Sequence, residues 1–169
     1  LGKLLGNSKF GHTQFNVEVE GFNYQNKYPE SFVKGIISSF DYSDYRYENI
    51  TLDGIYKDGG FNGKLALDDE NGAIQIDGTF NVAQRVSDIN LKASVRNFRP
   101  NALNLSDKYV DSDISLNLTA DFTGSSIDDV NGRILLDSLV LNTAEEQSYF
   151  LDQLTLSAGQ VSGEKEIQI

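Results

Sequence analysis

Strict alternation of apolar and polar residues is the feature that most constrains how this chain folds. In the segment DISLNLTADFTG, residues 113–124, the apolar residues Ile114, Leu116 and Leu118 are each followed by a polar one. A period of two places the apolar side chains on one face of a β-strand and the polar side chains on the other. About nine segments show this pattern, and they predict an all-β fold whose sheet has one apolar and one polar face.

Turn dipeptides separate several of these segments. Asp58-Gly59, Asn71-Gly72 and Asn131-Gly132 have the residue types that tolerate positive φ in tight hairpin turns. Because a hairpin joins neighbouring strands, we predict a largely antiparallel sheet. Helix signals are almost absent. The best candidates are one turn after Pro100 and a weak capping box in NTAEEQSYF, residues 142–150.

Several phrases recur along the chain. LDDENGAIQID at 67–77 returns as IDDVNGRILLD at 127–137, and one strand pattern recurs as YENITLDG, VSDINLKA and LDQLTLSA. Repeated amphipathic strands predict a sheet that grows by addition along an axis, like a solenoid. We therefore expect a single elongated β domain over residues 1–169, best supported over 45–160, and interpret the chain as a piece of a longer repetitive protein.

Charge and composition exclude several classes of function. The chain has 25 acidic and 14 basic side chains and a formal net charge of −11, which disfavours binding to nucleic acid. With no cysteine it has no disulfide, zinc thiolate or cysteine nucleophile. No apolar run approaches the roughly 18 residues that a membrane-spanning helix needs.

The acidic phrases raise the question of a metal or catalytic site. Asp68, Asp69 and Glu70, and again Asp128 and Asp129, lie ahead of an Asn-Gly dipeptide, but neither calcium-loop spacing is met. A carboxylate pair could also serve glycoside hydrolysis, yet among 25 acids some pair will always be adjacent. We favour turn chemistry and charged edges that discourage unwanted strand pairing over both readings.

No other motif indicates catalysis. His12 has no partner carboxylate, serine or second histidine in a recognisable pattern, and no Walker, G-x-S-x-G or HExxH motif occurs. The sequence predicts a non-enzymatic protein with no catalytic residues, no metal and no cofactor. The cluster of Tyr42, Tyr45 and Tyr47 could stack on sugars, as in a carbohydrate-binding module, but cross-strand aromatic pairs on an edge strand are favoured.

The recurring strands NITLDG, DINLKA and QLTLSAG, the segment NGAIQIDGTF and the insertion NFRPNALNL resemble the TamB/AsmA-like family. These are translocation and assembly module proteins of Gram-negative envelopes, and the Bacteroidota type is the most similar. The resemblance implies a periplasmic protein anchored in the inner membrane, whose sheet folds lengthwise into an apolar trough for phospholipid transport and outer-membrane biogenesis. We expect the anchor, and the region that meets the outer-membrane assembly barrel, to lie outside this chain.

The residues alone lead to a similar expectation. Amphipathic strands without helices leave an apolar face that either another part of the sheet or a ligand must cover. A closed core would make a structural or adhesive β-sandwich. An open sheet curled into a groove would shield phospholipid acyl chains, with each buried methylene contributing about 0.8 kcal/mol.

We favour the open groove, and we also expect the chain to self-associate through its sheet edges. The residues predicted to line the groove share the apolar side of their segments. They are Leu52, Leu65, Leu67, Ile74, Ile76, Phe80, Ile89, Leu91, Val95, Ile114, Leu116, Leu118, Phe122, Ile134, Leu136, Leu139, Leu141, Leu154 and Leu156.

Overall fold

The structure is a computed structural model, and it describes residues 9–22, 30–57, 59–81, 87–108, 110–124, 131–161 and 164–168. Of residues 22, 160–161 and 164–168 it describes the backbone alone. Ten β-strands follow one another in these ranges, and no helix occurs in them. The strands are β1 (Phe10–Phe22), β2 (Glu30–Tyr42), β3 (Tyr45–Lys57), β4 (Gly60–Asp69), β5 (Gly72–Asn81), β6 (Asp88–Phe98), β7 (Asp113–Thr123), β8 (Asn131–Asn142), β9 (Ser148–Val161) and β10 (Glu164–Gln168).

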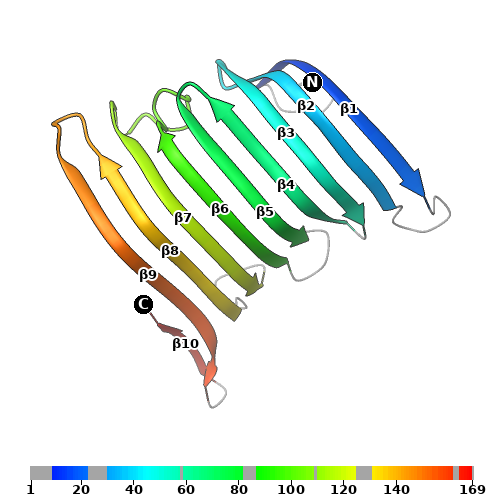
Figure 1. Ribbon diagram of the computed structural model, residues 1–169. Helices are drawn as coiled ribbons and strands as arrows, with labels where there is room; N and C mark the ends of the chain where they lie inside the picture. The colour runs from blue at the N-terminus through cyan, green and yellow to red at the C-terminus, as the bar shows by residue number, and fades with distance from the viewer. Residues whose placement is uncertain are drawn as a thin grey trace.

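The strands form one antiparallel sheet whose spatial order is the chain order, from β1 to β10. Figure 1 shows them side by side in a single layer, with the first and last strands at opposite edges. The predicted all-β, antiparallel architecture is confirmed. Because each strand pairs with its chain neighbour, every connection is local. β1 and β10 are the edge strands, and self-association through them stays a prediction.

Two-residue hairpins make the tightest connections. Ser43 and Asp44 link β2 to β3, with φ of 53° and 64°. Lys57 pairs with Gly60, so the predicted Asp58-Gly59 dipeptide joins β3 to β4; Asp58 itself lies outside the described residues, and Gly59 has φ of 79°. Residues with a small or polar side chain tolerate this left-handed conformation best.

Two of the predicted turns are shifted or absent. Asp69 pairs with Gly72, so the β4–β5 connection is Glu70-Asn71 and Gly72 is already the first residue of the strand. Asn131-Gly132 is not a turn at all: both residues open β8, where Gly132 pairs with Phe122. An Asn-Gly pair therefore marks the start of a strand here as readily as the tip of a hairpin.

Neither expected helical turn forms a helix. After Pro100 the backbone makes consecutive turns, in which the Leu103 N–H donates to the Arg99 carbonyl at 3.1 Å and the Leu105 N–H to the Pro100 carbonyl at 2.9 Å. In the second segment the Glu146 N–H donates to the Thr143 carbonyl at 3.1 Å, closing the β8–β9 hairpin. A single hydrogen-bonded turn does not offset the free-energy cost of helix nucleation.

β2 is a strand that alternation did not reveal. Ile36 lies opposite Thr51 on the polar face, between Lys34 and Ser38, and so interrupts the apolar and polar rhythm of the segment. Val33 and Ile37 lie on the other face, opposite Gly54 and Ile50. A strand at this position is specified by its two neighbours more than by its own pattern.

Bulges hold the apolar side chains on one face where the alternation changes phase. In β8, Leu136 pairs with Leu118 and Leu141 with Ile114, although an odd number of positions separates the two leucines. Ser138, with φ of 55°, takes up the extra residue. Such a bulge also increases the local twist of a sheet. Asn97, with φ of 47°, does the same in β6 between Val95 and Phe98.

The single layer leaves much of the molecule exposed. The accessible surface is 11621 Å², whereas a compact protein of 18.7 kDa would expose roughly 8,300 Å². Among the described residues the buried hydrophobic side chains are Tyr47, Leu67, Leu103 and Ala120. Three of these four belong to one cluster at one end of the sheet, and most other apolar side chains are half-buried by their neighbours in the same layer.

Candidate functional site

The apolar face of the sheet is the candidate site, and its side chains lie in rows that run across the strands. We name four rows by what they contain. The central row is Val17, Gly35, Leu52, Leu65, Ile76, Ala93, Leu118, Leu136 and Leu154. The inner row is Phe15, Ile37, Ile50, Leu67, Ile74, Val95 and Leu116.

The other two rows lie on the far side of the central row. The glycine row is Val19, Val33, Gly54, Gly63, Gly78, Leu91, Ala120, Ile134 and Leu156. The aromatic row continues from it across five strands. It comprises Tyr56, Phe61, Phe80, Ile89 and Phe122.

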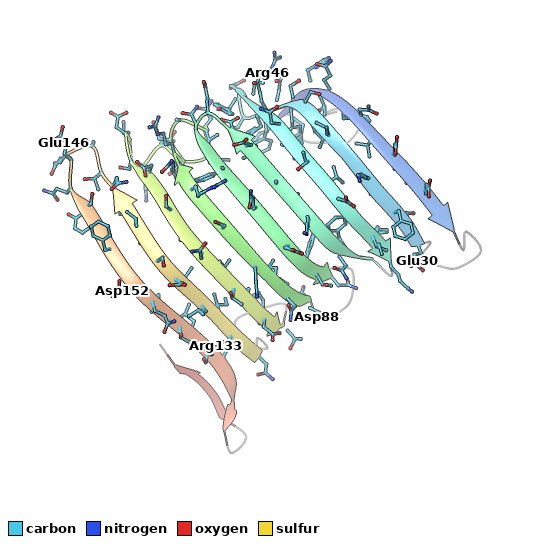
Figure 2. The ribbon with its side chains drawn as sticks, in the orientation of Figure 1. Glu30, Arg46, Asp88, Arg133, Glu146 and Asp152 are labelled. Carbon is cyan, nitrogen blue, oxygen red and sulfur yellow. The ribbon has the colours of Figure 1, made fainter. Side chains whose placement is uncertain are left out.

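The register brings the whole predicted lining set onto this face. The rows contain every member of the set except Ile114, Leu139 and Leu141. Ile114 pairs with both Phe98 and Leu141, which places them beyond the inner row on the same face, and Leu139 lies two positions from Leu141. Figure 2 shows the strands as a single layer, and no other described strand lies over the sheet.

Glycines lower the middle of the face in β3, β4 and β5. Gly54 and Gly63 are directly opposite each other, and a Cβ on Gly63 would lie 2.5 Å from the Gly54 Cα. A Cβ on Gly54 would lie 2.6 Å from the tip of the Phe61 ring. The aromatic ring therefore covers the glycine on the adjacent strand, a pairing that protects the backbone where a side chain is missing.

One end of the apolar face is covered by the chain itself. The connection after β6, residues 99–108, folds back over the ends of β3–β6, and we call it the strap. Leu103 is its anchor, with 0% exposure, and packs against Tyr47 and Leu67. Phe40, Tyr42, Tyr45, Ile50, Ile74 and Phe98 surround this cluster.

Hydrogen bonds hold the strap in addition to its packing. The Tyr47 hydroxyl donates to the Leu103 carbonyl at 2.8 Å, and the Asn104 amide donates to the Ser43 carbonyl at 3.1 Å. The Asn101 amide donates to the Ser106 carbonyl at 3.1 Å within the strap. Each of these carbonyls gains a partner in exchange for water, so the strap is held in one place.

The tyrosines of the β2–β3 hairpin belong to this covered end. Tyr42 pairs with Tyr45 and Phe40 with Tyr47, and the Tyr45 and Tyr47 rings lie 4.8 Å apart in an edge-to-face arrangement. Cross-strand aromatic pairs are therefore confirmed, although β1, and not this hairpin, forms the edge. With Tyr47 buried at 7% exposure, its ring offers no platform to a sugar.

The first acidic phrase serves the same end of the sheet. Asp69 accepts hydrogen bonds from the Tyr45 hydroxyl at 2.5 Å, the Asn71 N–H at 2.9 Å and the Glu48 N–H at 3.2 Å. Burial raises the pKa of Tyr45 to about 12, and the bond to Asp69 acts in the same direction. Asp69 is thus committed to turn chemistry. The second phrase begins outside the described residues.

The polar face carries a ladder of alternating charges across six strands. It comprises Glu18, Lys34, Asp53, Lys64, Asp77 and Lys92. Ion pairs join Lys34 to Asp53 at 3.5 Å and Lys64 to Asp77 at 3.7 Å. A hollow of about 980 Å³ lies over this ladder and the neighbouring row of Thr51, Gln75 and Asn117. This hollow is therefore on the polar side of the sheet.

Other sites that the sequence raised find no support in the described ranges. No three acidic or histidine side chains there come together in a way that could hold a metal ion. None of the residues described there forms a helix long and apolar enough to cross a membrane. The side chain of His12 is exposed on the edge strand β1.

Comparisons with known proteins identify no relative. No protein-family model, no curated protein and no solved structure matches this chain. The resemblance to the TamB/AsmA-like family therefore stays a prediction.

The sequence alone did not single out Leu103 or the glycine row, and it gave Tyr47 only as part of the tyrosine cluster. Leu103 lies in the insertion NFRPNALNL, where two leucines are too few to show a periodic pattern. A signal was present in the glycines: Gly54, Gly63 and Gly78 each sit at an apolar position of an alternating strand. A glycine in a strand interior commonly marks close approach of another group.

Proposed function

We propose that this chain is a non-enzymatic segment of a periplasm-spanning envelope protein, and that its apolar face shields the acyl chains of phospholipids. In this proposal the sheet curls lengthwise around the lipid and continues in further repeats. Its role is to serve phospholipid transport and outer-membrane biogenesis, including protein assembly. The observation that carries the proposal is an apolar face of four rows over which no described strand packs.

The energetics favour an acyl chain as the occupant. Leu65 in the central row and Phe80 in the aromatic row keep 40% and 45% of their surface exposed. An acyl chain of a dozen methylenes lying over such residues would gain roughly 10 kcal/mol, before the cost of ordering is subtracted. It needs no hydrogen-bond partner, and the rows offer it none. A contiguous apolar patch of this kind on a soluble surface marks an interaction site.

A structural or adhesive repeat is the other candidate. In that reading the apolar face is covered by protein, either further strands of the same molecule or a second sheet, and function resides in the connecting loops. The two readings differ in what touches the central row. Lipid should be found there in the first case, and protein in the second.

Site-specific photo-crosslinking distinguishes them. A photoreactive phenylalanine analogue is introduced at Leu118, in the central row, and in a separate variant at Thr119, the next residue, on the polar face. If the proposal is correct, irradiation in cells attaches phospholipid at Leu118 and little or none at Thr119. Protein adducts alone at Leu118, with no lipid, would contradict the proposal and favour the structural repeat.

A charge on the apolar face provides the functional test. Leu91→Asp places a carboxylate in the glycine row, whereas Asn90→Asp places the same group on the polar face one residue away. We expect Leu91→Asp to block lipid transport in cells and to reduce co-purifying phospholipid, with Asn90→Asp close to wild type. Normal transport by Leu91→Asp at unchanged protein level would show that the face has no such role.

A further inference from the structure

Burial along the apolar face is graded from one end of the strands to the other. At the strap the side chains are sealed, with Leu103 and Leu67 at 0% and 8% exposure. At the aromatic row, toward the other end of the same strands, Tyr56 and Phe80 remain exposed at 41% and 45%. Among the described residues, the apolar face of β3–β6 is thus covered at the strap and exposed at the aromatic row.

We propose that the strap is a stop that sets how far an acyl chain extends along β3–β6, with Leu103 as the residue that defines its limit. This inference rests on the proposed function. From Leu67 to Phe61 the strand β4 advances six residues, or about 20 Å at the rise of an antiparallel strand. A chain that enters over the aromatic row has this length of apolar surface before it meets the strap.

The fastening of the strap supports a fixed stop. Leu103 is held by packing against Tyr47 and Leu67 and by the 2.8 Å bond from the Tyr47 hydroxyl to its carbonyl. Side chains farther along the same segment behave differently: Leu105 is 49% exposed. Leu103 packs against the apolar face and Leu105 does not, so Leu103 marks the boundary of the exposed part of that face.

The test measures affinity for a series of saturated fatty acids of increasing length by displacement of a fluorescent fatty acid. For the wild-type protein, affinity should rise about fourfold with each added methylene, and then level off once the chain end reaches Leu103. In Leu103→Ala the levelling should move to chains longer by about three methylenes, the volume removed by the substitution. Leu105→Ala is the matched control and should keep the wild-type profile.

Tyr47→Phe provides a second variant in case the first fails to fold. It keeps the ring in the cluster and removes only the donor to the Leu103 carbonyl, and it should move the levelling in the same direction by a smaller amount. A wild-type affinity that rises with length throughout, or a levelling at the same length in folded Leu103→Ala and wild type, overturns the inference and leaves acyl binding standing. Failure of the wild type to bind any fatty acid overturns the proposed function itself, and the inference with it.

Discussion

The covered end and the middle of the apolar face have the same kind of residues and opposite packing. At the strap, Leu67 is 8% exposed because Leu103 and Tyr47 lie against it. Two residues away on the same strand, Leu65 is 40% exposed, because the strap does not cover it. Full burial of large side chains among the described residues therefore comes from the strap, and stability should be concentrated where the strap lies.

The sharpest way to break this comparison is to truncate one leucine from each region. Leu103→Ala leaves a cavity in the only sealed cluster of the described residues and should cost about 2–5 kcal/mol in the free energy of unfolding. Leu65→Ala removes a side chain that already meets solvent and should cost about 1 kcal/mol. Urea denaturation of the two variants measures both changes. Equal losses would mean that the middle of the face is covered as well.

The rows of the open sheet could be predicted from the sequence, whereas the strap could not. The central and inner rows follow from alternation, because the period of a strand is fixed at two and local in sequence. The register adds the bulges at Asn97 and Ser138. Without the bulge at Ser138, strict alternation from Leu136 would send Leu139 and Leu141 to the polar face. Those bulges depend on pairing with the next strand, so no single segment reveals them.

The strap could not be predicted in this way. Tyr47 and Leu103 are far apart in sequence, and their contact depends on the path of an irregular connection. Pro100 and the surrounding Asn and Ser residues predict a turn region, but turn chemistry does not predict where the loop packs. The sequence led to an apolar face open along its whole length, and the structure shows that a piece of the chain closes one end.

The hydrogen bond that fastens the strap should contribute less than its packing. Tyr47→Phe removes one buried donor and leaves the Leu103 carbonyl without it, which should cost about 1 kcal/mol. Tyr56→Phe makes the same change in the exposed aromatic row and should be close to neutral. The shift in the urea midpoint of each variant gives the answer, and a neutral Tyr47→Phe would show that Leu103 is held by packing alone.

The covered end should also respond to alkaline pH. The pKa of Tyr45 is raised by burial to about 12 from its ordinary value of 10. Between these values the unfolded chain releases the phenolic proton and the folded chain retains it, so this contribution to stability is complete below pH 10 and falls as the pH rises toward 12. Because lysines and the other tyrosines titrate in the same range, the measurement is the difference in melting temperature between wild type and Tyr45→Phe. That difference should shrink from pH 9 to pH 11.5; a difference independent of pH would contradict the assignment.

The smallest effect is expected on the polar face, where the ladder joins strands that the apolar rows already hold in register. The Lys64 and Asp77 side chains are 72% and 65% exposed, and an ion pair so open to water contributes about 0–1 kcal/mol. Lys64→Ala should therefore change the urea midpoint very little, and added salt should abolish even that change. Lys64→Asp is more informative, because it sets a third carboxylate between Asp53 and Asp77 and makes like charges face each other across both strand pairs. It should destabilise by up to about 1 kcal/mol at low salt and recover at high salt. A loss of several kcal/mol that persists at high salt would mean that the ladder, and not the apolar face, fixes the register, and the contrast between the two faces would be reversed.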